Sequence, residues 1–197
     1  EMKITWQRWY VHDILESNNV EYDNIFMVDV DTMIHWNAPN IFEECANGKF
    51  RACVDNDNLG WLKESIEGYQ HMFPDTKVDW ETYFNCGIIL MNKGHKDLCK
   101  TITFYETNEK HILDLQHKTL KKGSDQTPVN YMVNRDVEFE LMSKRWNLTH
   151  MMRKEILNYF MFVDTAWLWH FNGFEKTMRT QVMQAYWDNF GKNYEIK

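Results

Sequence analysis

The sequence predicts an α/β fold in which a mostly parallel sheet is flanked by helices. Apolar runs at residues 25–31 and 84–91 have the length of buried strands, whereas residues 4–17 and 96–121 carry apolar side chains near helical spacing. Strands that alternate with helices usually pair in parallel, because the helix returns the chain to the same end of the sheet. A functional site is then expected at the carboxyl ends of the strands.

Length and composition fit one globular domain. The chain has 197 residues, of which 44% are hydrophobic and 15% aromatic, so a sizeable core can form and disorder is not expected. The net charge is −7, and no basic run indicates binding to nucleic acid or to an anionic membrane. No repeat and no Pro/Gly-rich linker divides the sequence. We therefore expect a single domain over residues 1–197.

The cysteine pattern predicts free thiols. None of the four cysteines forms a C-x-x-C pair, so neither a zinc site nor a disulfide is indicated. No apolar run approaches the roughly 20 residues that span a bilayer, and no signal peptide opens the chain. We expect a soluble protein of a reducing compartment, the cytoplasm. The cysteines are Cys45, Cys53, Cys86 and Cys99.

Local patterns predict the elements of the first half. A helix over residues 4–17 is followed by the strand at 25–31. The sequence Asn-Ala-Pro at 37–39 is typical of a helix cap with proline in the first turn, so a short helix should follow. Residues 50–54 alternate as a strand does, and the Asp/Asn-rich segment 55–58 should close it with a turn.

The second half continues the alternation. A buried strand at 84–91 precedes a helical stretch over 96–121, which we expect to be interrupted near Asn108. Gly123 then marks a stop, and Asp125 has the residue type of an N-cap for the next helix.

Two further short strands complete the predicted sheet. One covers residues 137–141, and the other, at 161–163, should lead the chain toward His170.

The strongest functional signal is the pair Asp29 and Asp31 at the end of an apolar strand. Side chains of an extended chain alternate, so these two carboxylates should point the same way and Val30 the other way. Two such carboxylates cannot easily both stay ionised without a cation. Oxygen ligands suit Mg²⁺ or Mn²⁺ better than Zn²⁺. The alternative is a pair of solvated turn carboxylates.

Four later motifs accompany this D-x-D sequence. They are Phe84-Asn85-Cys86-Gly87, Asp125-Gln126, Arg145-Trp146-Asn147, and His170-Phe171-Asn172-Gly173-Phe174-Glu175-Lys176. In this order, the series resembles the nucleotide-sugar-dependent glycosyltransferases of the GT-A fold, a Rossmann-like fold, and most closely family 8, the glycogenin and galactosyltransferase-like enzymes. The resemblance covers about residues 3–176.

The resemblance implies a metal site and a catalytic pair. Asp29 and Asp31 would bind the metal and the donor diphosphate, and His170 would be the third protein ligand, which favours Mn²⁺ over Mg²⁺. Asp125 and Gln126 would be catalytic, orienting sugar hydroxyls and lying near the anomeric carbon. Without the resemblance, His170 would be taken as a core histidine and Asp125 simply as a helix cap.

The resemblance also implies further contacts with the nucleotide sugar. Gly87 would allow close approach of the backbone, and Asn85 would hydrogen-bond a sugar hydroxyl, although both also suit a turn that opens a strand. Gly173 and Lys176 follow the histidine at the family's spacing, and the Lys176 ammonium would lie on the departing β-phosphate. The family's usual Lys-Pro-Trp is absent, since Thr177-Met178 follow, so a surface lysine is the alternative.

The resemblance implies transfer of a sugar from a nucleotide-diphosphate sugar to a glycan, protein or lipid acceptor. The donor it implies is a UDP-sugar. Family 8 implies retention of the anomeric configuration without an obligatory enzymatic base. Two alternatives stay open. One is a non-catalytic nucleotide- or sugar-binding module. The other is a haloacid-dehalogenase-type phosphatase, whose first motif is also D-x-D but usually carries Thr or Val where this chain has Met33.

One departure from the family pattern concerns the start of the chain. About three strands normally precede the D-x-D strand and form the nucleoside pocket, but only 28 residues precede Asp29 here. We therefore expect the nucleoside-binding strands to be absent, either because the domain is reduced or because the chain is the C-terminal fragment of a longer one. An open sheet edge of this kind favours pairing with a second copy as a homodimer.

Overall fold

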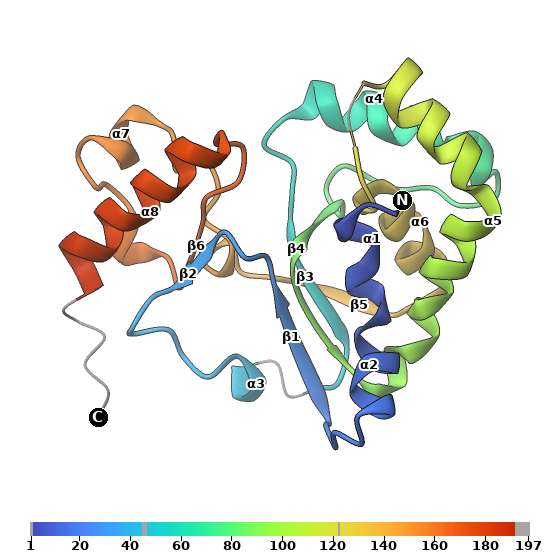
Figure 1. Cartoon of the computed structure of the whole chain (residues 1–197), viewed down its shortest axis with the longest axis horizontal. Helices are drawn as coiled ribbons and strands as arrows, with labels where there is room; N and C mark the ends of the chain where they lie inside the picture. Colours follow the sequence, from blue (N-terminus) through green and yellow to red (C-terminus); the bar gives the residue numbers. More distant parts are fainter. Residues whose placement is uncertain (1, 45–46, 122, 192–197) are drawn as a thin grey trace. The chain divides into compact units, whose positions relative to one another are not determined.

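The computed structural model describes residues 2–44, 47–121 and 123–191 (Figure 1). The chain divides into two compact units. The first unit comprises residues 1–27 and 47–141, and the second comprises residues 28–46 and 142–197. The predicted single domain over 1–197 stays a prediction.

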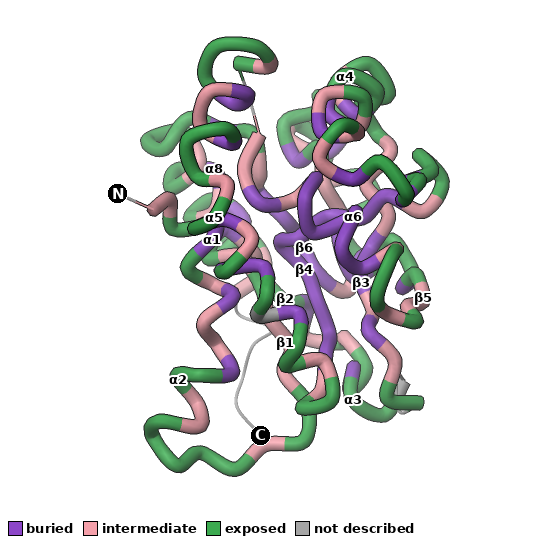
Figure 2. Tube along the Cα trace, turned by 90° about the vertical axis from the view of Figure 1, so that its right-hand side faces the viewer, coloured by how far each residue is buried: buried purple, intermediate pink, exposed green. Residues whose placement is uncertain are grey.

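A four-stranded sheet, in the order β1-β4-β3-β5, forms the centre of the first unit. Its strands are β1 (Asn24–Val28), β3 (Phe50–Val54), β4 (Phe84–Asn92) and β5 (Phe139–Met142). All of β4 except its last residue is buried, and Figure 2 shows its trace in purple. This explains the unbroken apolar run in the sequence, because a strand covered on both faces does not alternate. The described register of β3 with β4 is antiparallel, so a mostly parallel sheet is not confirmed.

Helices and short helical turns surround this sheet. Helix α1 packs on α5, which lies beside it in Figure 1, while α6 packs against β4 and α4 packs against α6. The helices are α1 (Ile4–Gln7), α2 (Val11–Ser17), α4 (Leu59–Tyr69), α5 (Lys100–Asp114) and α6 (Gln126–Asp136). The turns are of 3₁₀ type at Arg8–Tyr10, Gln70–Met72 and Lys93–Cys99, and of π type at Leu115–Thr119.

The buried side chain of Asn130 ties α6 to the start of β4. Its Nδ2 donates to the Phe84 carbonyl at 2.9 Å, and its Oδ1 accepts from the Phe84 N–H at 2.8 Å. Nδ2 also reaches the Gln126 carbonyl one turn earlier, at 2.9 Å. One amide therefore fixes the first turn of α6 relative to the strand that carries Asn85.

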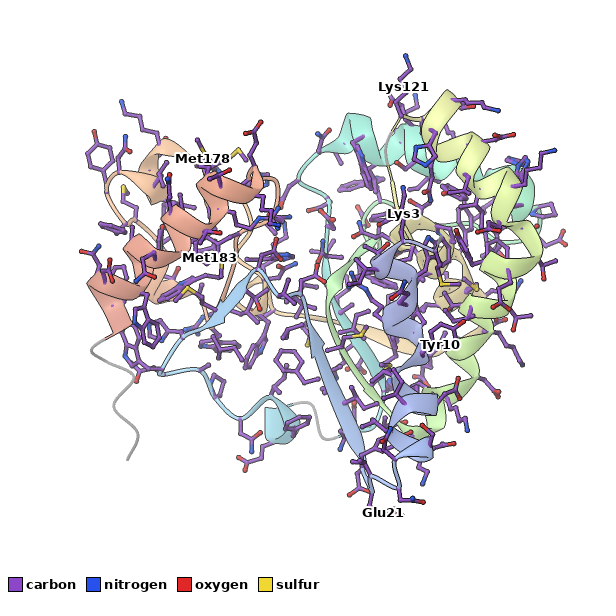
Figure 3. The ribbon with its side chains drawn as sticks, in the orientation of Figure 1. Lys3, Tyr10, Glu21, Lys121, Met178 and Met183 are labelled. Carbon is purple, nitrogen blue, oxygen red and sulfur yellow. The ribbon has the colours of Figure 1, made fainter. Side chains whose placement is uncertain are left out.

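The second unit contains a two-stranded antiparallel ladder and a small aromatic core. The ladder pairs β2 (Thr32–Ile34) with β6 (Leu168–His170). The core gathers around Trp169 and Tyr186, and Met183 of α8 packs against it, whereas Met178 of the same helix is exposed (Figure 3). The helices are α3 (Ile41–Glu44), α7 (Lys154–Leu157) and α8 (Lys176–Phe190), with 3₁₀ turns at Lys144–Trp146 and Val163–Thr165.

Most predicted elements are confirmed, but two predictions are wrong. Residues 161–163 do not form a strand, because Phe162 adopts a left-handed conformation (φ 68°) and caps a 3₁₀ turn; the strand before the turn to Gly173 is β6 instead. Helix α5 is not interrupted at Asn108, whose side chain donates to the Phe104 carbonyl at 2.9 Å. The regular helix ends later, at the π turn.

Two expectations about the whole chain can be compared with the described residues. Cys53 and Cys86 are buried and neither is in a disulfide, as predicted, whereas Cys45 and the side chain of Cys99 lie outside the part that the structure describes. Within that part, no helix has the length and apolarity needed to cross a membrane.

Replacing Asn130 with alanine should destabilise the first unit. The substitution leaves the buried N–H and C=O of Phe84 without their partner, which should cost about 2 to 4 kcal/mol. The shift of the urea midpoint, followed by circular dichroism, measures this. The matched control is Asn134→Ala on the same helix, whose single bond to the Asn130 carbonyl is only partly buried. Equal effects of the two substitutions would contradict the role given to Asn130.

Candidate functional site

Asp29, Asp31 and His170 come together within the second unit. Strand β1 ends at Val28, and a tight turn carries the chain into β2 at Thr32. The Thr32 hydroxyl closes this turn by donating to the Asp29 carbonyl at 2.7 Å. Val30 is 98% exposed and Asp31 only 9%, so the two residues face opposite ways as predicted, although through a turn and not an extended strand.

The register of the small ladder brings the histidine to the aspartates. Thr32 lies opposite His170, and the next residue, Phe171, donates its N–H to the Asp31 carbonyl at 2.8 Å. The His170 Nε2 atom is 3.4 Å from Asp31 Oδ1 and 3.7 Å from Asp29 Oδ2. One ligand atom from each residue lies within 4.8 Å of the others.

This donor set fits a divalent cation. Neighbouring ligands of an octahedral ion with bonds of about 2.1 Å are about 3 Å apart, close to the separations seen here. Two carboxylate oxygens and one imidazole nitrogen leave further positions for oxygens of a ligand. His170 Nδ1 lies 2.8 Å from Asn147 Oδ1. An imidazole that donates from Nδ1 to this amide oxygen presents the Nε2 lone pair to the carboxylates, as a metal ligand requires.

Arg179 of α8 neutralises and orients Asp31. Its Nη1 is 2.9 Å from Asp31 Oδ2, while the other oxygen, Oδ1, faces His170. With the His170 ring protonated and no cation bound, its hydrogen bond lowers the pKa of the Asp31 carboxyl; burial opposes this, and the charge of Arg179 lowers the pKa further. Asp31 is therefore ionised over the ordinary pH range.

Sequence reasoning did not assign roles to Asn147 or Arg179. Asn147 is part of the third motif, so that motif could have pointed to it. Arg179 has no motif; the only available signal was its position one helical turn after Lys176.

Gly173 lies between this cluster and helix α8, and Lys176 begins that helix. Gly173 has φ +78°, a backbone conformation that favours glycine, and a Cβ there would lie 3.3 Å from the terminal methyl of the exposed Met152. Lys176 is the exposed first residue of α8, and no ion pair of its ammonium is found among the described residues. The N-cap, Glu175, makes no capping bond through its side chain.

Asn85 and Gln126 form a polar cluster in the first unit together with Asp55. Asp55 Oδ2 accepts from Gln126 Nε2 at 2.9 Å and from Asn85 Nδ2 at 3.2 Å. Asn85 Oδ1 accepts from the Gly87 N–H at 2.9 Å, and Gln126 Oε1 accepts from the Cys86 N–H at 3.2 Å. Two predicted donor-sugar residues and one predicted catalytic residue are thus held together. Asp55 was expected only to form a turn.

Asp125 points away from that cluster, into the interior of the first unit. It is 1% exposed, and its Oδ2 accepts from Trp9 Nε1 at 2.8 Å and lies 3.7 Å from Arg8 Nε. The predicted N-cap position of Asp125 at the start of α6 is confirmed, but its side chain makes no capping bond and instead accepts from Trp9. Burial raises the pKa of its carboxyl, and Arg8 and Trp9 oppose this.

Comparison with solved structures assigns the fold. No protein-family model matches the chain, and no curated protein matches it by sequence. The fold resembles a glycosyltransferase involved in the glycosylation of the major capsid of PBCV-1, with a TM-score of 0.55 and 11% identity over 94% of this chain and 79% of that one. The chain therefore has an α/β fold found in a glycosyltransferase.

Two other structures match with lower TM-scores. Mouse xyloside xylosyltransferase 1 gives 0.48 at 16% identity, over 86% of this chain and 63% of that one. The bifunctional glycosyltransferase WbbM gives 0.49 at 14% identity, over 96% of this chain and 37% of that one. The chain thus spans less than two thirds of both proteins.

Asp125 should make the stability of the chain fall with rising pH. Its folded-state pKa lies above its ordinary value of 3.8, so the folded state binds this proton more tightly than the unfolded state does. Its contribution is greatest below the unfolded pKa and is lost as pH rises through the folded pKa. Asp125→Asn cannot ionise, so its free energy of unfolding should increase relative to that of wild type as the pH rises above the unfolded-state pKa of about 4.

Urea unfolding at several pH values measures this difference. Asp136→Asn, at the other end of α6, is the matched control, because Arg135 lowers the pKa of that exposed carboxyl and the expected trend is reversed. Parallel pH profiles for wild type and Asp125→Asn would show that the buried carboxyl does not titrate as stated.

Proposed function

We propose that this chain is a metal-dependent glycosyltransferase of the family 8 type, which transfers a sugar from a nucleotide-diphosphate sugar to an acceptor. One observation carries the proposal: Asp29, Asp31 and His170, from distant parts of the sequence, converge on one cluster with the composition of a divalent-cation site. The glycosyltransferase fold supports it, because such enzymes must neutralise a diphosphate leaving group.

The proposed cation is Mn²⁺, with Mg²⁺ as the alternative. Asp29, Asp31 and His170 would hold it, and the imidazole favours Mn²⁺. When bound, the cation would act as a Lewis acid that neutralises charge on the diphosphate. Arg179 would keep one oxygen of Asp31 away from the cation, and Asn147 would hold the His170 ring in the tautomer that ligates.

We propose that the start of α8 binds the departing phosphate. Its first-turn N–H groups carry the partial positive charge of a helix N-terminus and receive no bond from the Glu175 side chain. Lys176 would add an ammonium at the same end. Gly173 would let the backbone turn tightly between the histidine and this helix.

The polar cluster of the first unit is proposed to contact the donor sugar. Asn85 and Gly87 would contact the hydroxyl groups of the donor sugar, and the Gln126 amide would lie near its anomeric carbon. Asp125 is proposed to take part with Gln126. Since its carboxylate is engaged by Trp9 and lies near Arg8, its influence on a sugar would come through the placement of those residues.

Several finer features belong to the same proposal. By resemblance, the donor is a UDP-sugar, transfer proceeds with retention, and the acceptor is a glycan, protein or lipid. Location in a reducing compartment and pairing of two copies along a sheet edge stay predictions.

The proposal is tested by thermal shift with UDP, GDP, CDP and dTDP, each with Mn²⁺, Mg²⁺ or EDTA. A nucleotide at 100 times its dissociation constant should add about 2.7 kcal/mol of stability. We expect this shift for one nucleotide with Mn²⁺ and its loss in Asp31→Asn. Asp188→Asn, an exposed carboxylate of α8, should leave it unchanged. A shift that persists in EDTA would contradict the proposed metal site. Metal-dependent nucleotide binding without sugar transfer or donor hydrolysis would instead indicate a non-catalytic binding module.

Asn147→Ala should weaken Mn²⁺ binding without removing a ligand. The imidazole would lose the partner that fixes its tautomer, and loss of such a partner typically costs 10- to 100-fold in metal affinity. Free Mn²⁺ followed by electron paramagnetic resonance gives the dissociation constant. Asn189→Ala on α8 is the control, because its amide bonds only the Ala185 carbonyl. An unchanged dissociation constant in Asn147→Ala would remove Asn147 from the site.

A further inference from the structure

A pocket of about 500 Å³ lies in the first unit between α4 and the segment before β4. Its floor is apolar: Leu62 and Val78 are buried, and Ile66 is partly buried beside them. Its rim carries two large exposed side chains, Leu59 at 55% and Trp80 at 49%. The volume is in the range of small-molecule sites, and none of the residues assigned above lines it.

The charged side chains around this pocket balance one another. Lys63 and Lys77 are offset by Glu67 and Asp79. Lys63 lies 3.9 Å from Glu67 one turn along α4, and Asp79 accepts from the Glu81 N–H at 3.0 Å. A rim with equal numbers of both charges does not select an anion or a cation. It offers donors and acceptors to a neutral ligand rich in hydroxyl groups.

We propose that this pocket binds the saccharide acceptor, with a sugar ring lying on the Trp80 indole. An exposed indole offers a flat apolar face for the C–H side of a sugar ring, and its polar edge and the charged rim suit the hydroxyls. A free acyl chain would match the floor but would form no hydrogen bonds with the charged groups of the rim. The inference rests on the proposed glycosyltransferase function.

The pocket lies on α4 and on the segment before β4, which are continuous in the chain with two members of the polar cluster, Asp55 and Asn85. Asp55 donates its N–H to the Tyr83 carbonyl at 2.8 Å, which joins the segment before α4 to the segment before β4. The Asn58 side chain caps α4 by accepting from the Trp61 N–H at 3.0 Å. Leu59, the first residue of α4, follows this cap directly, and Trp80 precedes Tyr83 by three residues; both line the pocket. An acceptor on Trp80 would thus be carried by the segments that hold the proposed donor-sugar residues.

The test is saturation-transfer NMR of the whole chain with methyl α- and β-glycosides of glucose, galactose, mannose and xylose. We expect transfer to at least one glycoside. Trp80→Ala should weaken its binding about tenfold or more, whereas Trp80→Phe should keep most of it. Trp187→Ala is the matched control, because that indole in α8 is also 49% exposed. Trp80 is exposed, so an unchanged thermal midpoint should confirm that Trp80→Ala is folded.

Three outcomes would overturn the inference: no glycoside binds, Trp80→Ala binds as well as wild type, or only octyl glucoside binds through its alkyl chain. The Mn²⁺–nucleotide shift is measured on the same samples and should not change in Trp80→Ala. Glycoside binding that depends on Trp80 without any nucleotide shift would uphold the pocket and reject the transferase. A nucleotide shift with donor hydrolysis but no glycoside binding would reject the pocket alone.

Discussion

The pairing of β2 with β6 is the interaction on which the candidate metal site depends. Two carboxylates and an imidazole do not gather spontaneously, because the carboxylates repel each other and burial disfavours their charge. The ladder imposes the arrangement through backbone bonds that involve no charge: Thr32 lies opposite His170, and Phe171 donates to the Asp31 carbonyl. Trp169, the middle residue of β6, is part of the buried aromatic core, so packing of this core stabilises the ladder. The geometry of the site is therefore supported by packing that need not take part in its chemistry.

The first unit separates two adjacent residues that the sequence presents as one motif. Asn130 fixes the first turn of α6 to β4. At that turn, the side chains of Gln126 and Asp125 point in different directions. Gln126 joins Asp55 and Asn85 in a partly buried cluster, while Asp125 is fully enclosed with Trp9 and Arg8. The structural account of Asp125 is thus complete without a ligand: a buried carboxylate with an indole donor and a nearby guanidinium. Its proposed role in transfer needs the separate evidence of activity.

Much of this architecture could be predicted because it follows from local pattern. An unbroken apolar run located β4, and alternation located β3. The order of the motifs selected Asp29, Asp31 and His170 before any contact was known. The errors arose where a local turn or a tertiary contact overrides the usual preference of a residue type. Phe162 is apolar and sits in a strand-like run, yet it takes a left-handed conformation beside a 3₁₀ turn, and Asp125 has the residue type of a cap but serves Trp9. No role was predicted for Arg179 or Asp55, because the local sequence around each resembles that of an ordinary surface charge.

The charges around the metal-ligand cluster explain why a cation would be needed for an anionic donor. The whole chain carries a net charge of −7, and the cluster itself contributes two carboxylates. Arg179 could attract a phosphate, but its Nη1 already lies on Asp31, and its Nη2 donates to the Phe174 carbonyl at 2.9 Å. On the first turn of α8, Lys176 and the helix dipole remain, and exposed charges of this kind are weak in water. Without a cation, the carboxylates of Asp29 and Asp31 would repel a diphosphate. A divalent cation bound between them would attract both the carboxylates and the diphosphate.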